Sequence, residues 1–92
     1  MLSIVMIAWN EGPWIESSIR SICEATDGEY EFILIDDAST TGPDLADIGK
    51  RLPEAAGFSV MRMKTRAGVS ACRNFGRHIA LGDVIQFHDG HD

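Results

Sequence analysis

LSIVMIAW, residues 2–9, is a nearly unbroken apolar run, and it decides the fold class. A strand that is buried on both faces carries such a run, whereas a strand with one wet face alternates apolar and polar residues. No basic segment precedes the run and no cleavage site follows it, so we interpret it as a strand and not as a secretory signal. Strands covered on both faces belong mainly to parallel sheets with helices on either side.

Apolar runs and helix-like stretches alternate along the rest of the chain. Further strands are predicted at residues 30–35 (YEFILI), 58–63 (FSVMRM) and 83–88 (DVIQFH). Helices are predicted from Pro13 to Asp27-Gly28, from Asp44 to Leu52 and from Val69 to Gly82. The order βαβαβαβ predicts one Rossmann-like α/β domain over residues 1–92, with a mainly parallel sheet and helices on both faces.

Composition and charge exclude several classes of protein. With 45% hydrophobic and 24% charged residues the chain is globular, and no apolar run is long enough to cross a membrane. The net charge of −6 argues against a nucleic-acid surface, which only the cations between Arg62 and Arg77 favour. Two cysteines, Cys23 and Cys72, are too few for a disulfide scaffold, so we expect buried free thiols and a cytoplasmic protein.

Polar residues gather where the predicted strands end. The first strand ends in Asn10-Glu11, the second in Asp36-Asp37 and the fourth in Asp89-Gly90-His91-Asp92. The third helix opens after Gly68 toward the same rim of the sheet, where its free N–H groups and dipole can face a phosphate. Because ligands of such sheets bind beyond the carboxyl ends of the strands, we expect one ligand cleft at this rim.

Asp36-Asp37 follows a buried strand directly. Two adjacent carboxylates repel each other unless a donor or a cation meets one of them, so one of the pair is a candidate to bind a base or a ribose. Loop capping by aspartate is the alternative, and Ser39 after Asp37 favours a partly structural role. Trp9 at the strand exit is a second candidate to meet a base, whereas Trp14 is assigned to the core.

Asp89 and His91 lie one residue apart at the end of the fourth strand, so a short turn can bring both onto one ion. A carboxylate oxygen with an imidazole suits Mn²⁺ and other first-row divalent metals. A solvated polar terminus is the alternative for this segment. Arg66 and Arg73 flank the opening of the third helix and are candidates to meet a diphosphate, whereas Arg77 is expected on the solvated face.

Four segments, in this order and spacing, resemble family 2 glycosyltransferases with the GT-A fold, and together they run the length of the chain. They are Ser3–Met6 with Asn10-Glu11, residues 32–40 (FILIDDAST), residues 68–74 (GVSACRN), and residues 80–87 (ALGDVIQF) leading into Asp89-Gly90-His91. His91 stands where the common Asp-x-Asp motif has its second aspartate, which resembles the Asp-x-His motif of the polypeptide N-acetylgalactosaminyltransferases. Ile7 and Ala8 depart from the family, which usually has Pro and then Thr or Ser before the aromatic residue.

The resemblance implies that the chain is the nucleotide-sugar-binding portion of a hexosyltransferase-like, inverting enzyme. It implies a nucleotide-diphosphate sugar donor, with a UDP-sugar favoured, and Mn²⁺ or Mg²⁺ bound by Asp89 and His91 as a Lewis acid on the departing nucleotide. Asp37 is then the expected base-recognising carboxylate. The full set of expected nucleotide-binding residues is Ala8, Trp9, Asn10, Glu11, Asp36, Asp37, Gly68 and Arg73.

The metal motif is also where the chain stops. The family's acceptor-binding half and its catalytic base are therefore expected beyond residue 92, and residues 1–92 alone are expected to bind donor without completing transfer. The acceptor, whether carbohydrate, lipid or protein, stays open. Two alternatives also stay open, a dinucleotide-binding domain and a non-catalytic α/β module. Asn10-Glu11-Gly12-Pro13 is not the Gly-x-Gly-x-x-Gly loop that the dinucleotide-binding alternative needs.

Overall fold

The computed structural model describes residues 1–52 and 57–90. Strands and helices alternate in the predicted order. They are β1 (Leu2–Ala8), α1 (Trp14–Ala25), β2 (Tyr30–Asp36), α2 (Leu45–Arg51), β3 (Phe58–Arg62), α3 (Val69–Ile79) and β4 (Val84–Asp89). Within the described ranges, no helix has the length and apolar character needed to span a membrane.

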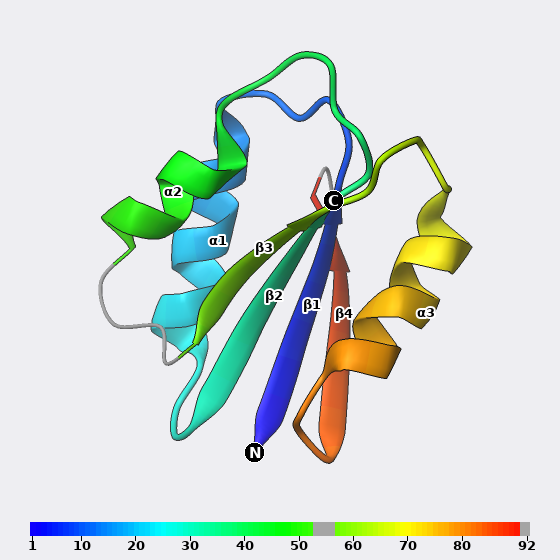
Figure 1. Cartoon of the computed structure of the whole chain (residues 1–92). Helices are drawn as coiled ribbons and strands as arrows, with labels where there is room; N and C mark the ends of the chain where they lie inside the picture. Colours follow the sequence, from blue (N-terminus) through cyan, green and yellow to red (C-terminus); the bar gives the residue numbers. More distant parts are fainter. Residues whose placement is uncertain (53–56, 91–92) are drawn as a thin grey trace.

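The four strands form one parallel sheet in the order β3-β2-β1-β4 (Figure 1). Ile4 of β1 lies beside Phe32 of β2 on one side and beside Gln86 of β4 on the other. The chain moves outward from β1 to β2 and β3, and then crosses back to place β4 on the other side of β1. The strand order therefore reverses between β1 and β4, and ligands of open α/β sheets bind at such a point. The predicted α/β fold is confirmed.

Each face of the sheet carries its own apolar layer. α1 and α2 cover one face, where Ile15 and Ile48 belong to one core with Met6 and Phe32 (Figure 1). α3 covers the other face, whose buried core residues are Val5, Ile7, Ile33, Ile35 and Cys72. Side chains alternate between the two faces along a strand, so a strand between two layers requires an unbroken apolar run. The interpretation of LSIVMIAW as a doubly covered strand is therefore confirmed.

α3 approaches the sheet closely at Gly76. A Cβ atom on Gly76 would lie 2.5 Å from Cγ1 of Val5 and 3.1 Å from Cδ1 of Ile35, closer than side chains normally pack. The missing side chain therefore allows α3 to lie directly against β1 and β2. This packing holds the opening of α3 beside the carboxyl ends of these strands (Figure 1).

All three helices end earlier than predicted, α2 by one residue, at Arg51. α1 ends at Ala25 and not at Asp27-Gly28, because Thr26 already has an extended backbone. α3 likewise ends at Ile79, because Ala80 is extended, and not at Gly82. Both cysteines are free thiols, one buried and one half-buried.

The assignment of Trp14 to the core is wrong. Its side chain is 51% exposed, and the buried residues of α1 begin with Ile15. Trp14 is the first residue of the helix, at the rim, and its indole N–H donates to Oε1 of Glu11 at 3.3 Å. Helical spacing aligned Trp14 with the apolar stripe but could not show that the stripe starts one residue later.

Candidate functional site

The carboxyl ends of the four strands and the loops that follow them form one rim, at the end of the sheet where α3 begins (Figure 1). β1 organises this rim through its last two carbonyl groups. The N–H of Asp37 donates to the carbonyl of Ala8 at 2.9 Å, and the N–H of Gly90 donates to the carbonyl of Ile7 at 2.8 Å. The exits of β2 and β4 are therefore both tied to β1.

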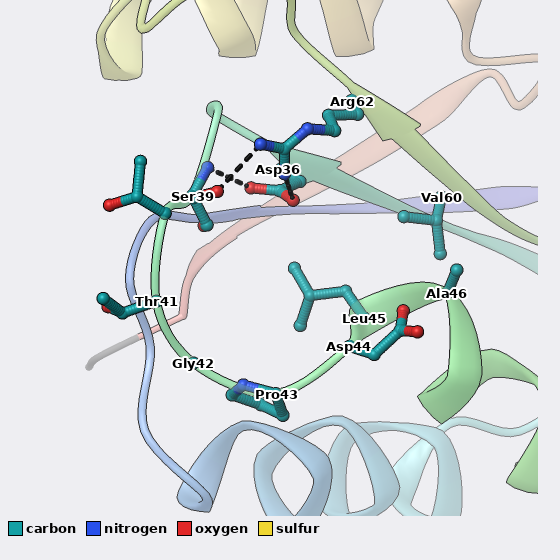
Figure 2. A pocket seen from close by; sticks show the side chains of 11 residues that line it. Asp36, Ser39, Thr41, Gly42, Pro43, Asp44, Leu45, Ala46, Val60 and Arg62 are labelled. Atoms are coloured by element: carbon teal, nitrogen blue, oxygen red, sulfur yellow. Dashed lines mark hydrogen bonds and ion pairs between the residues drawn. The ribbon is translucent and has the colours of Figure 1, made fainter.

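Asp36 and Asp37 point to opposite sides of the rim, as consecutive residues of an extended chain do. Asp36 lies on the side of α2, where its carboxylate accepts from Nη1 of Arg62 at 2.6 Å and from the N–H of Ser39 at 2.9 Å (Figure 2). Arg62 also donates to the carbonyl of Ser39 at 2.8 Å. Asp36 therefore caps its own loop, which is the structural alternative to ligand binding.

A pocket of about 250 Å³ lies next to Asp36, between the loop after β2, the start of α2 and the end of β3 (Figure 2). Residues 39–41, with their hydroxyl groups, and the charged Asp44 and Arg62 belong to its lining. Sequence analysis missed Arg62 as a site residue. The signal lies in the parallel register, which sets Arg62 beside Asp36, but it can be used only once β2 and β3 are known to be neighbours.

Asp37 lies on the side of α3 and ties the loop before α3 to the end of β2. Its Oδ1 accepts from the N–H of Ala67 at 2.7 Å and its Oδ2 from the N–H of Gly68 at 2.9 Å. Burial alone raises the pKa of Asp37, but these hydrogen bonds, the Cys72 thiol and the charge of Arg66 outweigh it and lower the pKa from its usual value. Burial and the neighbouring Asp37 raise the pKa of Cys72 to about 11, so the thiol stays protonated.

These contacts determine which hydrogen-bonding groups of Asp37 and Gly68 are available to a ligand. The N–H of Gly68, expected to face a phosphate, donates to Asp37 in this structure. Asp37 is only 2% exposed. An ionised carboxylate offers about four acceptor sites, so Asp37 retains about one beyond the N–H groups of Ala67 and Gly68 and the Cys72 thiol.

Asn10, also expected at the nucleotide, links two loops of the rim. Its N–H donates to Oγ of Ser39 at 2.9 Å, and its Oδ1 accepts from the N–H groups of Thr40 at 2.8 Å and Thr41 at 3.1 Å. Its φ of 49° is left-handed, a region that asparagine tolerates better than most residues. Ala8 before it is fully buried. Both residues therefore shape the loop that presents Trp9.

Glu11 lies beneath the end of β4. It is 4% exposed and accepts from the N–H of Trp9 at 3.2 Å and from the indole of Trp14 at 3.3 Å. A Cβ atom on Gly90 would lie 2.9 Å from both Cδ of Glu11 and Cδ1 of Ile15. Only glycine fits between Asp89 and His91 without moving Glu11, so the loop after β1 and the end of β4 are packed together.

Trp9 presents an aromatic face on the side of α3. Its side chain is 39% exposed, and the guanidinium carbon of Arg66 lies 3.5 Å from the centroid of its ring system. Nε of Arg66 is also 4.0 Å from Oδ2 of Asp37. A flat cation therefore stacks on the ring that was predicted to meet a base, beside the carboxylate that was predicted to recognise it.

Arg73 of α3 and Asp89 of β4 meet at the same side of the rim. Nη2 of Arg73 lies 3.5 Å from Oδ2 of Asp89. Oδ1 of Asp89 and Nε of Arg73 are both buried without a hydrogen-bond partner in the described part of the chain. An unsatisfied buried carboxylate oxygen is a suitable ligand atom for a divalent cation, so Asp89 fits the metal-binding role expected of it.

The second expected metal ligand, His91, lies outside the described residues. Among residues 1–52 and 57–90, no three His, Cys, Asp or Glu side chains form a cluster that could hold a metal ion. The α3 side of the rim thus brings together Trp9, Arg66, Asp37, Gly68, Arg73 and Asp89. Asp36 is turned away from this group.

Comparison with known proteins gives the family. The model of "Glycosyl transferase family 2" matches residues 3–92. A relative from Bacillus subtilis, the uncharacterized glycosyltransferase EpsJ, is 33% identical over the full chain, which spans 26% of EpsJ. The chain also spans only 28% and 36% of two other curated relatives.

Two solved structures share the fold. Residues 1–349 of S. aureus TarS superpose with a TM-score of 0.83 at 22% identity, covering 99% of this chain and 27% of that one. The same protein has been solved with UDP. The mannosyltransferase PcManGT from Pyrobaculum calidifontis, in complex with GDP-Man and Mn²⁺, has a TM-score of 0.80 at 21% identity over 97% of this chain and 27% of that one.

Proposed function

Since the chain belongs to glycosyl transferase family 2, we propose that residues 1–92 bind the nucleotide-diphosphate sugar donor of a glycosyltransferase. The observation that carries the proposal is the α3 side of the rim. There an exposed aromatic face, two arginines and a carboxylate with an unsatisfied oxygen lie beyond the point where the strand order reverses. A base, a diphosphate and a divalent cation are the ligands these groups suit.

The nucleoside is assigned to Trp9 and its surroundings. The indole of Trp9 can stack on a base in the place that Arg66 takes in the structure, and Asp37, 4.0 Å from Arg66, retains acceptor capacity for the N–H of a uracil. Ala8, Asn10 and Glu11 hold Trp9 in place, and Gly68 places the first turn of α3 beside it. Uridine is favoured as the nucleoside, in line with the UDP complex of TarS.

The diphosphate and the metal are assigned to Arg73 and Asp89. Mn²⁺ or Mg²⁺ would be held by Asp89 together with His91, in line with the Mn²⁺ in the PcManGT complex. The metal, when bound, supplies Lewis-acid stabilisation of the departing nucleotide. Arg73 adds a fixed positive charge for the phosphate oxygens. Asp36, which binds Arg62, is left to shape the loop after β2.

The reaction is proposed to be an inverting hexosyl transfer. Another part of the enzyme is proposed to bind the acceptor and to supply the catalytic base. The acceptor class is carbohydrate, lipid or protein. A cytoplasmic location stays a prediction from the sequence.

Isothermal titration of the 92-residue chain with UDP, with and without Mn²⁺, tests the proposal. Wild type should bind UDP in a Mn²⁺-dependent way, and Asp89→Ala should lose that dependence. Asp83→Ala is the matched control, because Asp83 lies at the opposite end of β4 with an 85% exposed side chain. NADH in place of UDP separates the dinucleotide-binding alternative. Binding of NADH in preference to UDP, or of Mn²⁺ without any UDP binding, by a folded chain would reject the donor-binding function.

A further inference from the structure

The ion pair between Arg73 and Asp89 joins two residues that the proposed function assigns to different parts of one ligand. Arg73 is expected at the diphosphate and Asp89 at the metal. In the structure the two side chains contact each other, with 3.5 Å between Nη2 and Oδ2. The ion pair therefore uses the same two charged groups that the metal and the diphosphate would use.

The pair is poorly satisfied. A relaxed arginine–carboxylate pair makes two parallel N–H···O hydrogen bonds at about 2.7–2.9 Å. Here a single longer contact is present, and Nε of Arg73 and Oδ1 of Asp89 are buried without partners in the described part of the chain. Each side chain thus retains one buried group for a second partner of opposite charge.

The guanidinium of Arg73 also lies over the aromatic ring of Phe87. The guanidinium carbons of Arg73 and Arg77 lie 5.8 Å and 5.9 Å from the centroid of the Phe87 ring. Both cations therefore share one aromatic ring, two residues before Asp89 on β4. The positive charge at this place attracts an anion and also opposes a cation that approaches Asp89.

We propose that Arg73 is a counter-ion that exchanges partners during donor binding. Without a metal, Arg73 neutralises Asp89. When a divalent cation binds the Asp89 carboxylate, it repels the guanidinium, which then pairs with the diphosphate. The first half of the exchange needs only the metal, and the second half rests on the proposed function.

Arg73→Met separates the two halves, because methionine keeps much of the apolar chain and removes the charge. Without its competitor, Asp89 should bind Mn²⁺ alone about threefold to tenfold more tightly. With Mn²⁺ at saturation, UDP should bind about tenfold more weakly, because a charge-assisted hydrogen bond to the phosphate is lost. The signature is two affinities that change in opposite directions. Isothermal titration measures both on the 92-residue chain, with circular dichroism to verify folding.

Arg77→Met is the matched control. Arg77 lies on the same helix and stacks on the same ring, but within the described residues the ion pair to Asp89 is made by Arg73. It should leave the Mn²⁺ affinity within about twofold of wild type, because the charge of Arg77 is exposed to solvent and acts on Asp89 without a direct ion pair. Arg73→Lys keeps the charge and should restore the weaker Mn²⁺ binding of wild type.

The possible failures are distinguishable. If Arg73→Met weakens Mn²⁺ binding or leaves it unchanged, Arg73 only positions Asp89, and the exchange is overturned while UDP binding by wild type still supports the proposed function. If both affinities fall together, the exchange is overturned as well. If wild type binds Mn²⁺ but no UDP, the proposed function fails, and tighter Mn²⁺ binding by Arg73→Met still supports competition for Asp89. A folded wild-type chain that binds no Mn²⁺ overturns both.

Discussion

Each end of the sheet holds a carboxylate with buried oxygen atoms, and the two carboxylates differ in how completely they are hydrogen-bonded. At the amino ends of the strands, Glu31 accepts from Oγ of Ser3 at 2.5 Å and from the N–H of Leu81 at 2.6 Å. At the carboxyl ends, Asp89 has one long ion pair and a buried oxygen without a partner in the described part of the chain. Unsatisfied buried groups lower stability and occur mainly at functional sites. Glu31 therefore stabilises the fold, whereas Asp89 keeps binding capacity for a ligand.

Removing the hydrogen-bonded carboxylate of Glu31 should have the largest effect on stability. Glu31→Ala leaves the buried hydroxyl of Ser3 and the partly buried N–H of Leu81 without an acceptor, so we expect a loss of about 3 kcal/mol in the free energy of unfolding. Urea denaturation measures it. Glu29→Ala, two residues earlier on an exposed position, is the control and should stay within about 0.5 kcal/mol of wild type. Equal losses in both variants would contradict a specific role for Glu31.

Asp37 tests whether any carboxylate at the ligand end contributes to stability. Asp37→Ala should cost about 2 kcal/mol, because the N–H groups of Ala67 and Gly68 lose their acceptor. The pKa of Asp37 is lowered in the folded state, so its contribution is fully present above the unfolded pKa of about 4 and is lost as the pH falls through the folded value. Wild type should therefore lose stability on acidification below about pH 4 more steeply than Asp37→Asn does. Parallel pH profiles from denaturation would reject this assignment.

Arg66 should contribute less, since its stack on Trp9 is exposed. Arg66→Ala is expected to cost at most about 1 kcal/mol but to change the emission of Trp9. Trp14→Phe provides a background in which Trp9 is the sole indole, because the chain has two tryptophans. Lys64→Ala, an exposed cation in the same loop, should leave the emission unchanged. An unchanged spectrum in Arg66→Ala would show that the stack does not persist in solution.

Asp89 should give the smallest effect on stability and the sharpest contrast with Glu31. Asp89→Asn removes a charge whose ion pair is long and incomplete, so the free energy of unfolding should change by no more than about 0.5 kcal/mol. Mn²⁺ binding should nevertheless be lost, because an amide oxygen carries no charge for the cation. Denaturation and titration on the same sample measure both. A loss of stability as large as that of Glu31→Ala would remove the distinction between the two ends.

The layered fold could be predicted because it depends on local patterns. A nearly unbroken apolar run at residues 2–9 predicts a strand covered on both faces, and β1 (Leu2–Ala8) has that cover in the structure. Helical spacing located α1 and α3, but it assigned Trp14 to the core because spacing does not show where a stripe meets the end of a layer. The family followed from four short segments, and the match over residues 3–92 confirms it.

The contacts of the site depend on partners far apart in the chain. Glu31 has its role because it accepts from the N–H of Leu81, and Arg62 has its role because it donates to Asp36. Each pair is far apart in the sequence, so neither contact could be predicted from the sequence. The sequence singled out the adjacent pair Asp36-Asp37, but the division of the two carboxylates between two sides of the rim follows from strand geometry in three dimensions. The metal assignment of His91 stays a prediction.

The position of β1 also has a consequence for biosynthesis. β1 is made before its second neighbour, β4, and Ile7 can pair with Asp89 only once the chain has been made as far as residue 89. Until then one edge of a strongly apolar strand is unpaired, and such edges promote aggregation. The Asp89 part of the rim therefore forms after the contacts of Asn10 with Ser39 and of Asp37 with Ala67, which need no residue of β4. A nascent chain that pauses before Val84 exposes the segment that most needs a chaperone.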